Sequence, residues 1–268
     1  MLLREVEYAK PGSIAEALEL LASNDGARAL AGGQTLINVM KARAASPDML
    51  VDLNGLEELR GIELAADGTL TIGAMTTYTE LMGSAEAKAR PILGEVCATI
   101  ADVQVRNRGT IGGNVCSNDP TNHLPPLLVA IGATMTIAGA DGERTVPAAD
   151  FFLGVYMTAA GPGELLTKVT VPPGKSDGFA SVPIGRDGTC IVNVAASLSN
   201  GSTRLAIGCV DAVPVSLTPA SSSDEDVSAA VQGANLDPPS DVHASADYRR
   251  HLAEVLARRA VAQAAGRN

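Results

Sequence analysis

Helical apolar spacing and short apolar runs alternate along the first two thirds of the chain. After Ser13, which forms a capping-box pattern with Glu16, apolar residues recur three or four positions apart as far as Leu21 and predict a helix. Further helices are predicted at 35–43, from Pro91 to about 100, and at 127–132. Short apolar runs predict strands at 27–31, 50–53, 70–74, 133–137 and 165–171. Together they predict an α+β fold in which residues 1–53 form a small α/β unit and 102–109 form a loop.

The pattern changes after residue 172. Pro172–Gly178 is rich in Pro, Gly and polar residues and is the best candidate linker. Beyond it, strands are predicted at 191–198, 205–210 and 213–217, and helices from about 227 and at 247–265. These elements predict a small C-terminal domain with an antiparallel three-stranded sheet and helices on one side. The predicted domains are therefore 1–173, with subdomains of about 1–54 and 55–173, and 178–268.

Composition excludes several classes of function. The formal net charge is -10, and the chain has no Trp, three Phe and four Tyr. Such a chain repels polyanions and has few platforms on which bases could stack, so no nucleic-acid partner is expected. No stretch approaches the ~20 apolar residues of a membrane span, and the N-terminus lacks a signal-peptide core. We expect a cytoplasmic protein.

The four cysteines are widely spread. Cys97, Cys116, Cys190 and Cys209 form no C-x-x-C pair. A disulfide framework, a zinc site or an iron–sulfur cluster would need closer grouping, so reduced thiols and no metal site are expected on this chain.

Two glycine pairs are the candidate ligand-binding segments. Gly32-Gly33 follows a predicted strand and precedes a predicted helix, and Gly112-Gly113 stands about eighty residues later between Thr110 and Asn114. Glycine admits positive φ and has no Cβ, so backbone N–H groups can converge on an anion. A single pair is usually only a turn. Two pairs in similar surroundings favour one ligand with two phosphates, although the spacing is not that of a Rossmann fingerprint.

Longer motifs around these pairs carry a resemblance to a known family. They are 31–35 (AGGQT), 71–77 (TIGAMTT), 102–114 (DVQVRNRGTIGGN), 119–120 (DP) and 151–154 (FFLG). The chain resembles the FAD-binding medium subunit of molybdenum hydroxylases, of the carbon monoxide dehydrogenase medium-chain and xanthine dehydrogenase family. The resemblance implies a two-subdomain FAD-binding domain of PCMH/VAO type followed by a small C-terminal domain.

The resemblance also implies the cofactors and partners. FAD would be bound non-covalently, whereas the molybdenum–pterin cofactor and the [2Fe–2S] clusters would belong to a large and a small partner subunit. The assembly would be a heterotrimer or its dimer. This chain would pass electrons from the clusters to an external acceptor, and none of its side chains would be catalytic on the organic substrate.

The same resemblance assigns roles to individual residues. The pyrophosphate contacts would come from the backbone of Ala31, Gly32, Gly33, Gln34, Thr35, Thr110, Ile111, Gly112, Gly113 and Asn114. Thr35 and Thr110 would add hydroxyl donors. Apolar contacts to the flavin would come from Ile100, Ala101 and Leu166, and Asp119 matches the family's Asp-Pro pattern.

Two positions depart from the family. His123 stands where many relatives have a carboxylate, and Arg186 is the one cation where relatives carry a Lys/Arg-rich stretch. Arg106 and Arg108 fit either a solvated, ion-paired segment or docking on the iron–sulfur subunit.

Other functions remain open from sequence. A self-sufficient flavin oxidoreductase on the VAO-type scaffold is the main alternative, and an interaction subunit that has lost its cofactor is another. Carbon monoxide, an N-heterocycle, a purine and an aldehyde all remain possible substrates of the complex.

Overall fold

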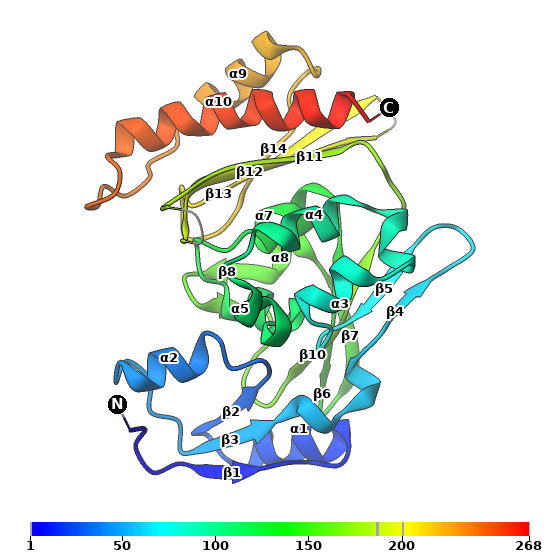
Figure 1. The fold of residues 1–268 in the computed structure, drawn as a ribbon, viewed down its shortest axis with the longest axis vertical. Helices are drawn as coiled ribbons and strands as arrows, with labels where there is room; N and C mark the ends of the chain where they lie inside the picture. Colours follow the sequence, from blue (N-terminus) through cyan, green and yellow to red (C-terminus); the bar gives the residue numbers. More distant parts are fainter. Residues whose placement is uncertain (1, 186–187, 200, 268) are drawn as a thin grey trace.

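Three larger β-sheets follow one another along the long axis of the molecule, with helices packed between them, and a two-stranded sheet accompanies the middle one (Figure 1). The computed structural model describes residues 2–185, 188–199 and 201–267. The buried apolar residues form three clusters, and two of them extend from one sheet to the next: Leu165 of the middle sheet joins the N-terminal cluster, and Ala195 and Ala206 of the C-terminal sheet join the middle one. Within these ranges, no helix combines the length and the apolar character that crossing a bilayer requires.

The N-terminal sheet is parallel and carries the first glycine pair. Its strands, in spatial order, are β1 (Glu7–Ala9), β3 (Met49–Asp52) and β2 (Ala27–Leu30). The helices of this part are α1 (Ile14–Ser23) and α2 (Leu36–Lys41). As predicted, Ser13 begins α1, and its hydroxyl accepts a hydrogen bond from the Glu16 amide at 3.2 Å.

The middle sheet is antiparallel and forms the framework around the second glycine pair. Its strands, in spatial order, are β4 (Ile62–Leu64), β5 (Leu70–Gly73), β10 (Leu165–Val171), β6 (Thr134–Gly139) and β7 (Gly142–Pro147). Two 3₁₀ turns lead into it, η1 (Leu53–Gly55) and η2 (Glu57–Leu59). A small hairpin, β8 (Phe152–Gly154) and β9 (Met157–Thr158), precedes β10.

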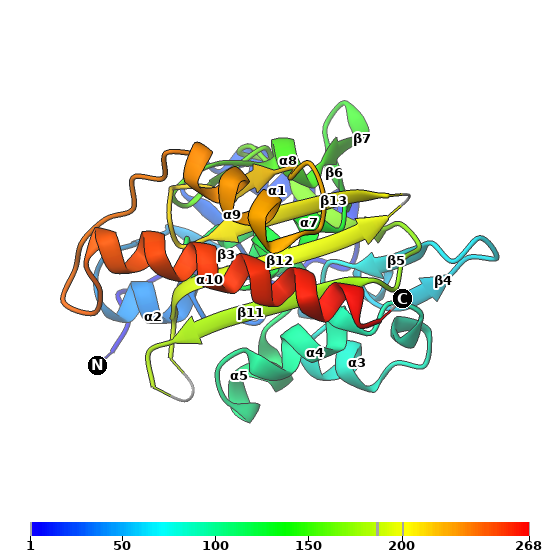
Figure 2. The same ribbon diagram turned by 90° about the horizontal axis from the view of Figure 1, so that it is seen from above.

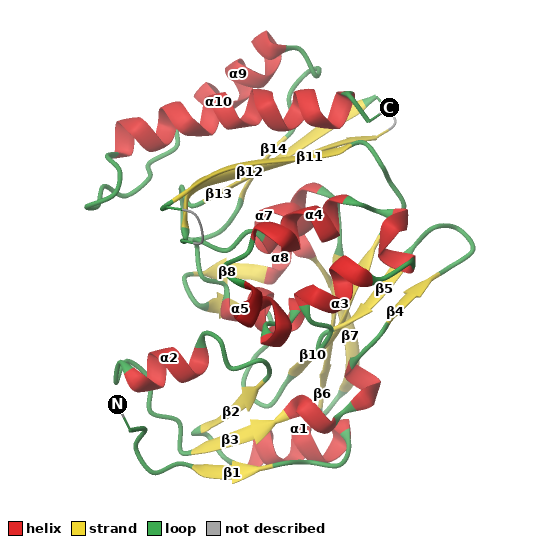
Figure 3. Ribbon diagram, viewed as in Figure 1, coloured by secondary structure: helices red, strands yellow, loops and turns green. Residues whose placement is uncertain are grey.

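Short helices pack on this sheet (Figure 3). They are α3 (Tyr78–Gly83), η3 (Glu86–Ala89), α4 (Ile92–Thr99), α5 (Val103–Arg108), α6 (Ile111–Ser117), α7 (Leu124–Ala130) and α8 (Ala148–Phe151). The prediction of a loop at 102–109 is wrong, because α5 occupies it. The Asp102 carboxylate caps α5 by accepting from the Val105 amide at 2.8 Å. This helix buries none of its residues, so it leaves little apolar periodicity in the sequence.

The C-terminal sheet has four strands, one more than predicted. They are β11 (Asp177–Pro183), β12 (Cys190–Ser199), β13 (Ser202–Gly208) and β14 (Val215–Leu217), all antiparallel. The extra strand, β11, begins inside the predicted linker. It is an edge strand, where Gly and Pro are tolerated, and Gly178 is required because a Cβ there would strike the Ala260 carbonyl.

The two faces of this sheet pack against different parts of the chain. Helices α9 (Asp224–Gly233) and α10 (Ala246–Ala265) cover one face (Figure 2). The other face lies on α4 and α7, and Ala195 and Ala206 join the core of the middle part. The division at 173–178 into separate domains stays a prediction.

A buried ion pair fixes the segment that enters this sheet. Arg90, after η3, donates to both carboxylate oxygens of Asp177, with Nε–Oδ2 at 2.7 Å and Nη2–Oδ1 at 2.8 Å. The same guanidinium donates to the Pro172 carbonyl at 2.5 Å and the Ser197 hydroxyl at 3.2 Å. The side chains of Arg90 and Asp177 are 3% and 1% exposed. Arg90 therefore fixes the predicted linker near both of its ends, at Pro172 and at Asp177.

Replacing Arg90 tests this ion pair. Arg90→Met leaves the Asp177 carboxylate buried without its partner, so we expect the free energy of unfolding to fall by about 3–5 kcal/mol. Arg250→Met is the matched control, since Arg250 pairs with Asp247 on the surface and the loss should stay below about 1 kcal/mol. Denaturant titration followed by circular dichroism measures both. Equal losses in the two variants would contradict the assignment.

Candidate functional site

The two glycine segments lie against each other. A Cβ added to Gly32 would overlap the carbonyl group of Arg108, and one added to Gly113 would lie 3.5 Å from the Cβ of Ala31. Segments about eighty residues apart thus approach backbone to backbone. The structure therefore brings together the two groups of residues that the sequence selected.

The N-terminal segment has free backbone donors. It connects the end of β2 to the start of α2, and Gly33 has a φ of 72°, which glycine adopts without strain. Among the described residues, no hydrogen-bond partner is recorded for the amides of Gly32, Gly33, Gln34 and Thr35. The Thr35 side chain is exposed and does not cap α2. Consecutive amides of this kind can bind an anion.

A hydrogen-bond network that the sequence did not reveal holds this segment. The Asn54 amide group donates to the Ala31 carbonyl at 3.0 Å and to Asp52 at 2.6 Å. Asp52 also accepts from the Tyr8 hydroxyl at 2.5 Å. Burial alone would raise the pKa of Asp52, but the hydrogen bonds from Tyr8 and Asn54 outweigh it and lower the pKa. The pattern Asp-x-Asn after a strand was the available signal for a turn.

The second segment is a helix start, and this corrects the expectation of an open glycine loop. Gly112 and Gly113 lie in α6, and neither is among the residues with positive φ. Their amides are already used, by the Ala74 carbonyl at 2.8 Å and the Thr110 hydroxyl oxygen at 3.0 Å. Glycine is needed here for close packing, since a Cβ at Gly112 would lie 2.6 Å from the Ala74 carbonyl oxygen.

Side chains are therefore the open groups on this side. The Thr110 hydroxyl accepts from Gly113 and keeps its own proton to donate. Asn114 is buried, and within the described structure its Oδ1 has no hydrogen-bond partner. Burial raises the pKa of the neighbouring Tyr78 hydroxyl, and a hydrogen bond from Asn114 opposes that effect. An unpaired buried amide oxygen costs free energy, which a ligand donor would recover.

Arg106 holds the turn formed by Ile100 and Ala101. The guanidinium Nη1 donates to their carbonyls at 2.9 and 2.6 Å. Ala101 has a φ of 44°, unusual for a residue with a Cβ. Arg106 thus stabilises a strained turn inside the chain, a role that neither interpretation of it anticipated, whereas Arg108 is exposed.

The remaining predicted residues fall into three situations. Asp119 accepts from the amide and hydroxyl of Thr121 at 2.9 and 2.7 Å, and from the Tyr156 hydroxyl at 3.2 Å. Leu166 is 5% exposed and belongs to the middle core on β10. Arg186 lies outside the described residues.

The arrangement suits a diphosphate better than a metal ion. One side offers free amides and the other the Thr110 hydroxyl proton, with no Cβ at the closest approach. The unpaired Oδ1 of Asn114 is an acceptor, so it suits a donor group of the ligand and not the diphosphate itself. In the part of the chain that the structure describes, no three His, Cys, Asp or Glu residues are grouped to hold a metal.

Comparison with known families decides the ligand. Residues 4–174 match the family described as the FAD binding domain in molybdopterin dehydrogenase. The chain belongs to this family. Both glycine segments, Asp119 and Leu166 lie within the matched range of the FAD-binding domain, and the free donors described above fit the diphosphate of FAD.

Relatives and solved structures agree with this membership. The carbon monoxide dehydrogenase medium chain of Afipia carboxidovorans is 39% identical over 97% of this chain and 97% of its own length. The nicotine 6-hydroxylase medium subunit of Paenarthrobacter nicotinovorans is 32% identical over 100% of both chains. A chain of the reconstituted CO dehydrogenase from Oligotropha carboxidovorans matches with a TM-score of 0.92 and 36% identity over 100% of both chains. The predicted resemblance is confirmed, and the chain is an FAD-binding oxidoreductase subunit.

Gly32 offers a direct test of the site. Gly32→Ala places a methyl group against the Arg108 carbonyl and forces the two segments apart. We expect FAD affinity to fall at least about tenfold, which corresponds to about 1.4 kcal/mol. Titration of the FAD-stripped chain, followed by flavin fluorescence, measures the change.

Gly83→Ala is the matched control for this substitution. No atom lies within 4 Å of a Cβ at that position, so its FAD affinity should equal that of the wild type. A circular dichroism spectrum of each variant separates local displacement from unfolding. A folded Gly32→Ala chain with unchanged affinity would refute the two-segment site.

Proposed function

We propose that this chain is the electron-transferring FAD subunit of a heteromeric molybdenum hydroxylase. The observation that carries the proposal is the meeting of the free amides of 32–35 with Thr110 and Asn114 inside the FAD-binding family range. When bound, FAD supplies chemistry that links one-electron carriers to two-electron acceptors. Electrons would arrive from [2Fe–2S] clusters of a small partner subunit and leave to an external acceptor.

The chain's own residues would bind and orient the cofactor without covalent attachment. The backbone of Ala31–Thr35 would hold the diphosphate from one side, and the Thr110 hydroxyl would donate to it from the other. The Asn114 Oδ1 would accept from a donor group elsewhere on the cofactor. Because the amides of Ile111, Gly112 and Gly113 are paired within the chain, this second side would act through side chains.

Other residues would surround the flavin. Ile100, Ala101 and Leu166 are proposed to provide apolar surroundings for the ring, and Asp119 a polar contact beyond α6. Arg186 is proposed as the cation at the same site.

A partner complex would supply the rest of the reaction. Relatives are named as medium chains or medium subunits, among them those of glyceraldehyde dehydrogenase and nicotine 6-hydroxylase. We propose a large molybdenum–pterin subunit and a small [2Fe–2S] subunit, in a cytoplasmic heterotrimer or its dimer. The substrate would be chosen by the large subunit, so this chain leaves carbon monoxide, N-heterocycles, purines and aldehydes open. The division into 1–173 and 178–268 is part of the proposal.

Reduction experiments test this function. The isolated chain should bind FAD but show no bleaching of flavin absorbance when organic substrate is added anaerobically. The complex with its two partner subunits should show bleaching after the iron–sulfur absorbance changes, in stopped-flow spectra. Substrate-driven bleaching in the isolated chain would instead establish the self-sufficient flavin oxidoreductase. A folded complex unable to bind added FAD would refute both.

A further inference from the structure

A cluster of reactive side chains lies outside the proposed FAD site, where α7 meets the C-terminal sheet. This thiol cluster consists of His123, Cys190, Asn193 and Cys209. The Cys190 sulfur lies 3.3 Å from Nε2 of His123, at the start of α7. Cys209 lies within hydrogen-bonding range of Cys190, and Asn193 donates to the Cys209 sulfur at 3.5 Å.

The surroundings distinguish the two thiols. Hydrogen bonding from Cys209, followed by the contact with His123, lowers the pKa of Cys190. The same contact with Cys190, together with burial, raises the pKa of Cys209. Both effects make Cys190 the more readily ionised thiol of the pair.

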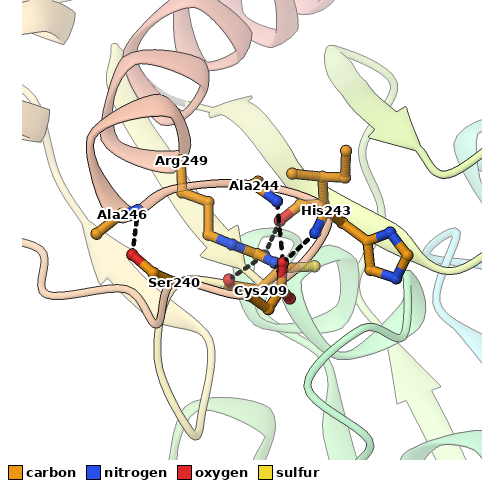
Figure 4. Close-up of polar contacts among 8 residues, drawn as sticks. Cys209, Ser240, His243, Ala244, Ala246 and Arg249 are labelled. Carbon is orange, nitrogen blue, oxygen red and sulfur yellow. Dashed lines mark hydrogen bonds and ion pairs between the residues drawn. The ribbon is translucent and has the colours of Figure 1, made fainter.

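Hydrogen bonds from the Arg249 side chain hold the main chain beside the two thiols. Arg249 extends from α10 toward Cys209 (Figure 4), and its Nη1 donates to the carbonyls of Cys209 at 3.3 Å and Ile191 at 2.5 Å. Its Nη2 donates to Asp241 at 2.6 Å. Cys209 follows β13 with a φ of 68°, so its side chain leaves the regular strand direction. One buried guanidinium therefore fixes the main chain beside both cysteines.

Access to the cluster is narrow. Cys190 and Cys209 are 2% and 6% exposed. A cavity of about 10 Å³, lined in part by Asp119, Pro126 and Cys209, adjoins it. That volume holds about one water-sized molecule. The cavity is lined by Cys209 but not by Cys190. Hydrogen peroxide, which has two heavy atoms, would therefore reach Cys190 only through a local opening of the cluster, and a disulfide of the size of oxidised glutathione would need a much larger one.

We propose that the thiol cluster is a peroxide-oxidation site in which Cys190 is attacked first and Cys209 then closes a disulfide. In the first step, the Cys190 thiol proton passes to His123 and the thiolate sulfur attacks a peroxide oxygen. The S–O bond forms as the O–O bond breaks, and the departing hydroxide takes the proton from His123 to become water. Cys190 is then a sulfenic acid, and the peroxide has been reduced.

The second step uses the neighbouring thiol. The Cys209 sulfur attacks the Cys190 sulfur, its proton leaves with the sulfenic hydroxyl as water, and the S–S bond forms. The sum is two thiols and one hydrogen peroxide giving one disulfide and two waters. The bond would join the start of β12 to the end of β13 and draw Cys190 away from α7.

Peptide mapping of the full chain tests the proposal. The purified chain is treated with hydrogen peroxide, unfolded, alkylated with N-ethylmaleimide and digested with trypsin. Because Arg204 lies between the two cysteines, they fall on separate peptides that stay joined only through a disulfide. We expect the linked pair in the wild type. In Cys209→Ser, we expect a Cys190 sulfenic acid that dimedone traps.

Two further variants test whether His123 activates the Cys190 thiol or only lies close to it. His123→Asn should slow closure at least about tenfold, because the proton acceptor and donor is lost. Cys116→Ser, which changes a cysteine of α6 outside the cluster, should leave closure unchanged. Complete alkylation of Cys190 and Cys209 after peroxide treatment would overturn the proposal, as would closure at the wild-type rate in folded His123→Asn.

Discussion

The backbone contact between Gly32 and Arg108 is the constraint on which the cofactor site depends. It places the end of β2 against the segment that enters α6, and it leaves no room for a Cβ. The N-terminal and middle sheets, which also share a buried cluster containing Val51 and Leu165, are thereby joined where their glycine segments meet. The need for glycine at this point in the chain thus follows from packing alone.

The Arg90–Asp177 pair has a corresponding role where the middle part of the chain meets the C-terminal sheet. Burying two charges costs desolvation energy, and only good geometry and additional hydrogen bonds offset it. Here both carboxylate oxygens, the Pro172 carbonyl and the Ser197 hydroxyl satisfy the guanidinium. Such a pair has a narrow range of acceptable positions, so it favours one orientation of the C-terminal sheet over the middle part.

Sequence patterns predicted the helices and strands that depend on residues close together in the chain. The β10 strand appeared at its observed bounds, Leu165–Val171, and α10 within one residue of its start. Strand β11 was missed because Gly178 packs against α10, and a contact between segments so far apart leaves no local signal. For the site, the motifs selected two segments that the structure brings together, and their contacts with the cofactor stay a prediction. The Tyr8–Asp52–Asn54 support was missed because Tyr8 and Asp52 are 44 positions apart.

The same limit explains why the two glycine pairs looked equivalent and are not. In 32–35 the amides have no hydrogen-bond partner among the described residues, so a diphosphate would replace water at these groups. In α6 the first three amides donate to oxygen atoms of Thr76, Ala74 and Thr110. These hydrogen bonds fix the start of the helix without a ligand. Helix α6 is already fixed and offers few donors, whereas the turn at 32–35 offers several. Binding would therefore require little reorganisation of the chain. Most of the diphosphate's backbone hydrogen bonding would therefore fall on the N-terminal segment, and α6 would determine where the ligand lies against it.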